Sequence, residues 1–435
     1  MLKSMHVYFS GIGGTGIGPL ALIAHQAGLR VSGSDKQDNL YIKYLRTKGI
    51  TDIHIGQAYD DIAAVHARQS IDWFVYTSAL PMEQPNAPEL RFCRDHAIKH
   101  SKRDEFLNDF LHQKNLQLIA IAGTHGKTTT TAMAVWLCKQ VGIPISYAVG
   151  TKLSFGEMGE FDPASRYFIY EADEFDRNFL AFRPHLSLIT GLDWDHPDIY
   201  PTRQEYNDAF RQFLGQSTQT MMWQSDAALL GCTPSNTKGL TCIDEQDTAI
   251  EQLITLPGRV NRLDAWLVAH GIHAEMNLPL GELYTKLNRF PGLSRRFEQI
   301  VPGLYSDYAH TAPKIRGALQ VAHEQAGANV VVVYEGLHNT RQHFMKNDLE
   351  HLFDAVKQLY IVPSYLARED PNLPLLSPAD LKKLLSDQAQ AHTKSAQLDD
   401  QLRATMQQHI DAGDLVLAIT AGGGGSLDEW LRQQF

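Results

Sequence analysis

Short apolar runs alternate with helical segments along most of this chain of 435 residues. Runs of buried-strand length occupy residues 6–10, 31–35, 73–77, 118–122, 167–170, 186–190, 330–334, 359–362 and 415–420, and helical patterns occupy residues 17–27, 102–113, 130–141 and 263–270. Strands that alternate with helices are typical of parallel sheets. The pattern therefore predicts an α/β protein, and the more polar segment 215–255 gives no clear element.

The chain is too long for one ordinary hydrophobic core. A new strand, loop and helix begin just after Lys114, and the composition changes again near Leu287. We therefore expect three domains, at residues 1–113, 114–288 and 289–435. The third should be a small α/β domain with a mostly parallel sheet.

Composition narrows the class of protein. Hydrophobic residues make up 43% of the chain and charged residues 20%, as in a soluble globular protein. The net charge of −10 argues against nonspecific nucleic-acid binding. The four cysteines lack C-x-x-C spacing, and no apolar run is long enough to span a bilayer. We expect a cytoplasmic protein with neither nucleic-acid nor membrane partners.

The stretch 118–131, LIAIAGTHGKTTTT, carries the clearest chemistry. An apolar strand leads into a glycine-rich turn, and a helix follows. Backbone N–H groups and the helix dipole favour a phosphate group at such a turn. Lys127 would reach the outer phosphates, and the Thr128 hydroxyl would bind Mg²⁺. Ile121 stands where the general P-loop pattern has its first glycine, but strand, turn and helix agree, so we predict a nucleotide site.

A second glycine loop follows the first strand. Residues 11–16, GIGGTG, with Asp35 about 20 residues further on, match a dinucleotide fingerprint. Taken alone, this pattern predicts an NAD-dependent dehydrogenase. Ser78 follows the strand at 73–77, and ligands of open α/β sheets bind where strands end. A role in lining that crevice and a plain loop serine are equally consistent with this position.

Two acidic runs follow consecutive central strands, EADEFD at 171–176 and GLDWDH at 191–196. Magnesium takes oxygen ligands from carboxylates and phosphates. Acidic strand ends beside a P-loop therefore favour a Mg²⁺–nucleotide site, although spacing alone does not select one carboxylate.

Taken in order, these motifs resemble the Mur ligases of peptidoglycan synthesis along nearly the whole chain. GIGGTGIG is similar to the UDP-sugar loop of that family, AGTHGKTTTTAM to its ATP loop, EADEFD and DWDH to its metal strands, and LPGRVN to its adenine segment. LSRRF, SDYAH and the final glycine-rich turn resemble its third domain. The resemblance implies a Rossmann-like UDP-binding domain, a central P-loop ATPase domain and a C-terminal Rossmann-like α/β domain.

The resemblance also implies an amide ligation. ATP phosphorylates the carboxylate of UDP-N-acetylmuramate, L-alanine attacks the acyl phosphate, and ADP and phosphate leave. An unactivated carboxylate does not accept an amine at neutral pH, and phosphoryl transfer depends on positioning and charge neutralisation, so the residues agree with this chemistry. The implied cofactors are ATP and Mg²⁺. The implied partners are UDP-N-acetylmuramate and L-alanine or a short peptide, and we expect a monomer or weak dimer.

The resemblance assigns a role to residues in every part of the site. The implied catalytic residues are Lys127, Glu171, His196 and Arg296, and the implied metal ligands are Thr128, Glu171 and His196. The implied ATP contacts are Gly123, Thr124, His125, Gly126, Lys127, Thr128, Thr129, Asn261, Arg295, Arg296 and Asp307. The implied UDP-sugar contacts are Gly11, Gly13, Gly14, Thr15, Gly16, Asp35 and Ser78, and the implied amino-acid contacts are His310 and Arg341.

The amino-acid end departs from the family pattern. Residues 337–341, LHNTR, stand where the alanine-adding ligases usually have His-Arg-Tyr-Thr-Arg. With Glu335, parts of this run look a little like the ligases that rejoin a recycled peptide to the same sugar. In the adenine segment, Val260 and Asp264 replace a usual histidine and asparagine. These changes leave the ATP-driven mechanism intact but leave the amine open, with L-alanine first and a recycled peptide second.

Two other classes remain as alternatives. A dehydrogenase explains the first glycine loop but nothing about the Gly-Lys-Thr sequence. A non-catalytic relative that senses UDP-sugar and ATP would have no need to retain Lys127, Thr128, Glu171 and His196.

Overall fold

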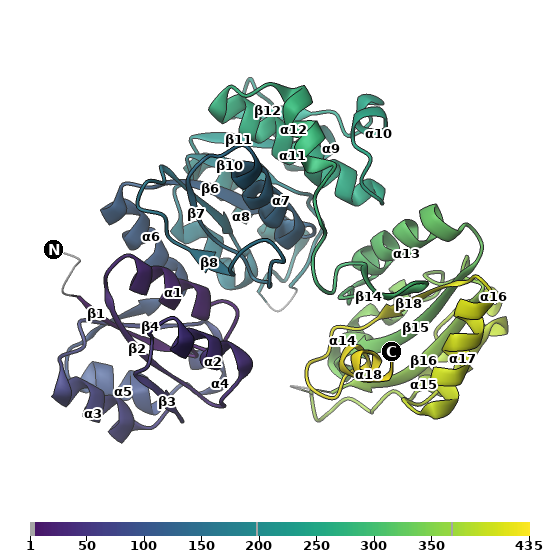
Figure 1. Ribbon diagram of the computed structural model, residues 1–435, viewed down its shortest axis with the longest axis horizontal. Coiled ribbons are helices and arrows are strands. Elements are labelled where there is room, and N and C mark those ends of the chain that lie inside the picture. Colours follow the sequence, from purple (N-terminus) through teal and green to yellow (C-terminus); the bar gives the residue numbers. More distant parts are fainter. Residues whose placement is uncertain (1–4, 197–198, 367–368) are drawn as a thin grey trace. The chain divides into compact units, whose positions relative to one another are not determined.

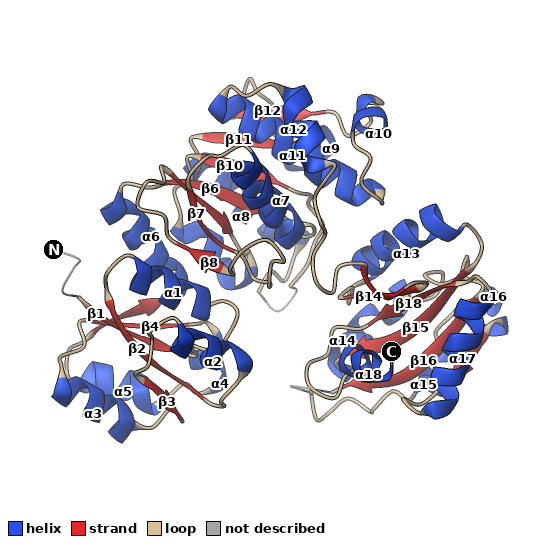
Figure 2. Cartoon of the chain, viewed as in Figure 1, coloured by secondary structure: helices blue, strands red, loops and turns tan. Residues whose placement is uncertain are grey.

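The computed structural model describes residues 5–196, 199–366 and 369–435. These residues form three β-sheets with helices packed against them (Figure 1). Strands and helices alternate along the chain, as the apolar pattern predicts (Figure 2). One compact unit contains the described parts of Met1–Ile254 and Leu263–Phe290, and a second contains those of Thr255–Arg262 and Pro291–Phe435. The domain boundaries at 113 and 288 stay predictions, and residues 1–4 of the first predicted domain lie outside the described residues.

The first sheet is five-stranded and parallel, in the order β3-β2-β1-β4-β5. Its strands are β1 (His6–Ser10), β2 (Arg30–Asp35), β3 (Ile53–Ile55), β4 (Trp73–Tyr76) and β5 (Lys99–Lys102). Its helices are α1 (Gly18–Gln26), α2 (Leu40–Thr47), α3 (Tyr59–Arg68), α4 (Ala79–Glu83) and α5 (Pro88–Asp95). Because β1 lies between β2 and β4, the first glycine loop leaves the sheet where the strand order reverses, which is the usual ligand position in such folds.

The second sheet is seven-stranded, in the order β12-β11-β10-β6-β9-β7-β8, and its one antiparallel pair is β7 with β8. Its strands are β6 (Gln117–Ala122), β7 (Ile145–Ala148), β8 (Gly159–Glu160), β9 (Tyr167–Glu171), β10 (Leu186–Ile189), β11 (Gln219–Trp223) and β12 (Leu240–Ile243). The associated helices are α6 (Arg103–Lys114), α7 (Lys127–Gln140), α8 (Arg203–Gln216), α9 (Gln224–Leu230), α10 (Ala249–Leu253), α11 (Arg259–Met276) and α12 (Leu280–Leu287), with a short 3-10 segment, η2 (Phe175–Ala181).

The position of β6 explains how the central site forms. It pairs in parallel with β9 on one side and with β10 on the other. The carboxyl ends of three neighbouring parallel strands share one edge, so the loops that leave them converge. That edge brings the Gly-Lys-Thr turn together with both acidic runs, as predicted from their sequence positions.

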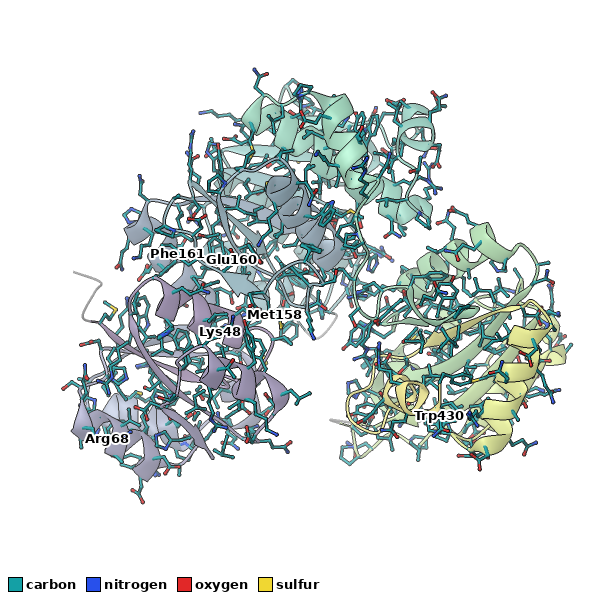
Figure 3. The ribbon with its side chains drawn as sticks, viewed as in Figure 1. Lys48, Arg68, Met158, Glu160, Phe161 and Trp430 are labelled. Atoms are coloured by element: carbon teal, nitrogen blue, oxygen red, sulfur yellow. The ribbon has the colours of Figure 1, made fainter. Side chains whose placement is uncertain are left out.

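The first and second sheets are joined by direct contacts inside their common unit. The ammonium of Lys48, the residue directly after α2, pairs with the Glu157 carboxylate at 2.9 Å. Figure 3 shows Lys48 near Met158, the residue that follows Glu157. The Phe161 N–H donates to the Gln26 side chain at the end of α1, at 2.8 Å. These contacts fasten β8 and its flanking loops onto the first sheet.

The third sheet is six-stranded, in the order β13-β14-β18-β15-β16-β17, and its one antiparallel pair is β13 with β14. Its strands are β13 (Glu298–Val301), β14 (Leu304–Asp307), β15 (Val330–Leu337), β16 (Gln358–Tyr365), β17 (Thr393–Ser395) and β18 (Leu415–Ile419). Its helices are α13 (Ala312–Ala326), α14 (Asn339–Met345), η3 (Lys346–Asp348), α15 (Pro378–Lys383), α16 (Asp387–Ala391), α17 (Asp400–Asp411) and α18 (Leu427–Gln434). The predicted mostly parallel sheet is confirmed.

Two local expectations were wrong, and one segment that was given no element contains regular structure. The segment 215–255 contains the short strands β11 and β12, which lie at one side of the second sheet. The polar residues that flank these strands give the segment the composition of a loop. The helix expected at 263–270 extends over Arg259–Met276, and the helix expected from residue 130 already begins at Lys127. The left-handed turn at Gly126 sets this start, so its position follows from backbone geometry that threonine-rich composition does not reveal. No helix in the described part of the chain is long and apolar enough to cross a bilayer.

Candidate functional site

The turn between β6 and α7 has the backbone of a phosphate-binding loop. Gly123 and Gly126 adopt φ angles of 134° and 78°, which residues with a Cβ rarely adopt. A Cβ at Gly123 would also lie 2.9 Å from the Gly191 carbonyl oxygen. Helix α7 begins directly after Gly126, so its first N–H groups and its dipole face the turn. The turn can therefore hold an anion, and glycine is required at both positions.

Thr124 ties this turn to the end of β10. Its N–H donates to the Gly191 carbonyl oxygen at 2.8 Å, and its hydroxyl donates to the Asp193 carbonyl oxygen at 2.6 Å. The Thr190 hydroxyl in turn donates to the His125 carbonyl oxygen. Through these bonds, Thr124 holds the loop against the segment that follows β10. The predicted ATP contacts of Thr124, His125 and Thr129 stay predictions.

Lys127 is the centre of the charge arrangement. Its ammonium donates to the Gly123 carbonyl oxygen and to the Glu174 carboxylate, both at 2.6 Å. Burial by itself lowers the pKa of Lys127, but the carboxylates of Glu174, Asp173 and Glu171 raise it above its usual value. Burial raises the pKa of the Glu174 carboxyl, and the Lys127 ammonium opposes that shift. Lys127 is therefore a fixed cation at the mouth of the anion-binding turn.

Two of the three predicted metal ligands are in contact. The Thr128 hydroxyl donates to Oε1 of Glu171 at 3.0 Å. The third, His196, lies with its Nε2 atom 3.8 Å from Oε1 of Glu174 and 3.9 Å from Oδ2 of Asp195. His196 therefore lies beside Glu174, in the acidic run that follows β9.

This arrangement fits a divalent cation that takes some of its ligands from the protein and the others from phosphate oxygens. Oε1 of Glu174 is buried and has no hydrogen-bond partner in the described part of the chain. The hydroxyl of Thr128 and the carboxylate of Glu171 are hard oxygen donors of the kind that Mg²⁺ prefers. The described residues contain no group of three or more histidine, cysteine, aspartate or glutamate side chains able to hold a metal ion on their own.

The first glycine loop is held by the acid that the sequence pairs with it. The Gly13 N–H donates to Oδ2 of Asp35 at 2.8 Å, and the N–H groups of Gly11 and Ile12 donate to the Ser34 carbonyl oxygen. Asp35 therefore shapes the loop from the end of β2, and its predicted contact with the UDP-sugar stays a prediction. The loop residues with the same predicted role are Gly11, Gly13, Gly14, Thr15 and Gly16, all at the carboxyl edge of the first sheet.

Ser78 and Arg103 connect the first sheet to the acidic run of the second. The Ser78 hydroxyl donates to the Asn178 side chain at 3.2 Å, so Ser78 faces the segment that follows β9. The Arg103 guanidinium lies 3.5 Å from Asp173 and occupies the space that a Cβ at Gly16 would need. Through Arg103, the first glycine loop is therefore linked to the acidic run that follows β9.

In the second unit, both guanidinium groups of the predicted arginine pair lie over the Tyr308 ring, but Arg295 also makes polar contacts. The Arg295 guanidinium donates to the Gly422 carbonyl oxygen at 2.9 Å and lies 3.5 Å from the Asp428 carboxylate. The final glycine-rich turn is thus a packing partner of Arg295. The Arg296 guanidinium lies over the Tyr308 ring at 5.3 Å and forms no ion pair or hydrogen bond among the described residues.

Asp307, His310 and Arg341 lie in the same unit. Both carboxylate oxygens of Asp307 accept backbone N–H groups at 2.8 Å, from Phe297 and Ala309. Burial raises the pKa of Asp307, and Arg296 opposes the shift. Burial holds the pKa of His310 well below its usual value, with a smaller contribution from Arg341.

His310 is therefore neutral, and its Nε2 atom lies 3.5 Å from the Lys314 ammonium. The amino-acid contacts predicted for His310 and Arg341 stay predictions. In the same unit, the side chain of Asn261 donates to the Pro257 carbonyl oxygen at 2.7 Å. The predicted roles of Asn261, Arg295, Arg296 and Asp307 toward ATP stay predictions.

The two arginines should differ in their contribution to stability. Arg295→Ala is expected to lower the free energy of unfolding by about 1.5–3 kcal/mol, because it removes hydrogen bonds made by a charged group. Arg296→Ala should cost about 1 kcal/mol or less, the scale of an accessible cation–π contact. Melting temperatures of the full chain by calorimetry test the order, and a larger loss for Arg296→Ala would contradict it.

Sequence analysis missed two charged residues that the fold places at the site. Glu174 contacts Lys127 and approaches His196, yet the spacing within EADEFD gave no reason to choose it beside Glu171. Arg103 lies in the helix expected at 102–113 and was given no role at the site. Its contact with Gly16 is visible only in the folded chain, because the two residues are far apart in sequence.

The sheets, the turn and the acidic strand ends define a P-loop α/β protein with a second glycine loop. Residues 6–115 match the family model described as "Mur ligase family, catalytic domain", and residues 121–228 match that of the "Mur ligase middle domain". Together the two matches cover half of the chain. The chain belongs to the Mur ligase family, which confirms the resemblance found in the sequence and removes the reason for a dehydrogenase.

Individual relatives cover nearly the whole chain. The UDP-N-acetylmuramate–L-alanine ligase of Renibacterium salmoninarum is 28% identical over 96% of this chain and 93% of its own length. Among solved structures, the UDP-N-acetylmuramate–alanine ligase of Thermotoga maritima has a TM-score of 0.73 at 22% identity, with 99% and 98% of the two chains covered. A murein peptide ligase of Psychrobacter arcticus has a TM-score of 0.63 at 20% identity, with the same coverage. The structural likenesses establish the three-domain fold.

Proposed function

We propose that the protein is an ATP-dependent ligase that joins L-alanine to the carboxylate of UDP-N-acetylmuramate. The observation that carries the proposal is the likeness, along almost its full length, to relatives named for that reaction. The arrangement of Lys127, Thr128 and Glu171 supports ATP as the source of energy.

The site supports a mechanism in two steps. The sugar carboxylate attacks the γ-phosphorus of ATP, the bond to the β-phosphate oxygen breaks, and ADP leaves. The amine then attacks the acyl phosphate, so that a C–N bond forms, a proton is lost from nitrogen, and phosphate leaves. Lys127, anchored by Glu174 and the Gly123 carbonyl oxygen, would bind the outer phosphates and offset the charge that moves during transfer.

Mg²⁺, when bound, supplies further charge neutralisation at the phosphates. Thr128 and Glu171 are the residues we propose to hold it, with His196 as a third contact. The glycine loop of the first sheet, residues 11–16, would bind the UDP moiety at the position where the strand order reverses.

A second candidate, ligation of a recycled peptide to the same sugar, rests on two observations. A murein peptide ligase shares the fold across the whole chain, and residues 337–341 depart from the pattern of the alanine-adding ligases. Asn339 in this run is buried and bonded to Pro374 and Leu376 of its own unit, so it has a structural task there.

Phosphate release with different amines separates the candidates. With UDP-N-acetylmuramate, ATP and Mg²⁺, we expect L-alanine to give a kcat/KM about tenfold or more above glycine and L-serine, because small differences in side chain are worth about that much. The recycled tripeptide is the fourth amine in the assay. A tripeptide rate above that of L-alanine would select the second candidate. No release with any amine would favour a non-catalytic nucleotide-binding relative.

A further inference from the structure

Asp264 is a buried carboxyl group that lies directly against the phosphate-binding turn. It belongs to α11, and its residue is 7% exposed. A Cβ added to Gly126 would lie 2.8 Å from one Asp264 carboxyl oxygen and 3.1 Å from the other. The carboxyl group therefore occupies the space beside the Gly126 backbone. The mechanism above does not use it.

The surroundings of Asp264 provide no counterion. No cationic side chain of the described residues forms an ion pair with it. Apart from Asp264 itself, the titratable groups on the loop and on α7, α11 and α12 are the basic groups His125, Lys127, Lys139, Lys286, Arg259, Arg262, His270 and His273, together with Cys138, Tyr284, Glu275 and Glu282. His125 and Lys127 both adjoin Gly126 in sequence, and the Lys127 ammonium is directed to the Gly123 carbonyl oxygen and Glu174. An ionised Asp264 would consequently be a buried charge without compensation, which is costly.

We propose that Asp264 is a positioning residue for the phosphate-binding turn and that it holds Gly126 in place as a neutral carboxylic acid. The proposal rests on the proposed function, because it assumes that the turn binds the phosphates of a nucleotide. It adds a residue and a protonation state that the proposed mechanism does not contain.

The electrostatic reason is simple. The turn presents backbone N–H groups and a helix dipole to an anion. A neutral carboxyl behind Gly126 leaves that field intact, whereas a carboxylate would weaken it and repel the phosphates. Burial raises the pKa of Asp264 to about 8, and the Thr130 hydroxyl opposes the shift. The group is then neutral at pH 7 and ionises over the range in which many enzymes are still folded.

The coupling between proton release from Asp264 and nucleotide binding gives the expected size of the pH effect. If bound nucleotide excludes the ionised form, the apparent dissociation constant rises with the ionised fraction of the free protein. With a pKa of about 8, nucleotide binding should weaken about tenfold between pH 7 and pH 9. ADP and ATP complete their own ionisation below this range, so the ligand does not produce the change.

The experiment measures ADP–Mg²⁺ binding to the full chain by titration calorimetry at pH 7, 8 and 9. The wild-type protein should show the tenfold loss, and Asp264→Asn, which keeps the shape without the charge, should change less than about twofold. Glu89→Gln is the matched control. Glu89 is also a buried carboxyl with a raised pKa, but it accepts the hydroxyls of Tyr8 and Ser10 in the first sheet. This variant should keep the wild-type pH dependence.

Thermal unfolding without nucleotide provides a second measurement. The unfolded-state pKa of an aspartate is about 3.9. Between that value and the folded pKa of about 8, the native state binds one proton more than the unfolded state, so Asp264 makes stability fall as pH rises. The melting temperature of Asp264→Asn should therefore exceed that of the wild type by an amount that grows from pH 5 to pH 8 and then levels off.

The outcomes separate this proposal from the proposed function. Nucleotide binding that is independent of pH in the wild type, or that weakens equally in Asp264→Asn, overturns the role of Asp264 alone. A melting-temperature difference that stays constant from pH 5 to pH 8 overturns the neutral carboxylic acid. If the wild type binds no nucleotide at any pH, the proposed function fails and this proposal fails with it.

Discussion

Replacement of Lys127 by alanine is expected to lower ATP-dependent phosphate release by about 10³-fold or more, the scale on which loss of a charge that stabilises a transferring phosphoryl group acts. The ammonium is held between the Gly123 carbonyl oxygen and the Glu174 carboxylate at the anion-binding turn. Without it, the turn keeps its N–H groups but loses its fixed cation. Phosphate release with UDP-N-acetylmuramate, L-alanine and Mg²⁺ measures the effect.

Two comparisons make the Lys127 result specific. Lys139→Ala removes the other lysine of α7, which pairs with Glu160 at 2.6 Å, and should leave phosphate release nearly unchanged. UDP binding to Lys127→Ala, measured by calorimetry, should remain at the wild-type level because the first glycine loop lies on a different sheet. Turnover by Lys127→Ala close to the wild-type rate would refute the assigned active site.

Replacement of Glu171 by glutamine should lower phosphate release about 100-fold at low Mg²⁺ concentration. The change removes the negative charge but keeps an oxygen that can accept a hydrogen bond from the Thr128 hydroxyl. In the unmodified protein this hydroxyl donates to Oε1 of Glu171 at 3.0 Å. Changes at a metal site typically cost about 10–100-fold in metal affinity or activity. The diagnostic measurement is the Mg²⁺ dependence of the rate, because a weakened metal site is partly restored by more Mg²⁺.

The control for Glu171 is Glu160→Gln. Glu160 lies on β8 of the same sheet and bonds to Lys139 and Tyr147, away from the turn. Its replacement should alter neither the rate nor the Mg²⁺ dependence. If Glu171→Gln has the wild-type Mg²⁺ dependence, Glu171 is not a metal ligand.

The contact between Lys127 and Glu174 has a consequence for nucleotide binding. The lysine that should hold the outer phosphates already has an anionic partner, at 2.6 Å. Phosphate oxygens must therefore share or replace this partner when ATP binds. Burial raises the pKa of Glu174, so its carboxylate takes up a proton more readily than an exposed carboxylate does. Glu174 thus emerges as a residue that keeps Lys127 charged and oriented in the nucleotide-free protein.

Strand and helix prediction succeeded where the apolar period was strong. The strand expected at residues 6–10 is β1, and the one expected at 118–122 is β6 with one further residue. Prediction failed for β11 and β12, since short strands with polar flanks resemble loops. It also failed at both ends of α11, where Arg259–Met276 extends well beyond the apolar core of the helix. Local composition does not reveal that the ends of α11 are supported by neighbouring elements.

For the site, residue type and order predicted which segments meet, but not which polar atoms are already hydrogen-bonded within the protein. The turn, the glutamate of β9 and Thr128 were expected together, and Thr128 does contact Glu171. The ligand contacts expected for Thr124 and Asp35 stay predictions, and in the folded chain their side chains also bond to the backbone of Asp193 and Gly13. A polar side chain beside a loop can hold either the loop or a ligand, and only coordinates distinguish the two.

By itself the sequence determined the α/β class, the two glycine loops, the family and the central lysine, because each depends on local patterns: apolar period, glycine where φ is positive, and residue order. The tertiary structure decided which charges face one another. It placed Glu174 on Lys127, Arg103 against Gly16 and Asp264 behind Gly126. These pairs are far apart in sequence, and their energies depend on burial and distance, quantities that exist only once the chain is folded.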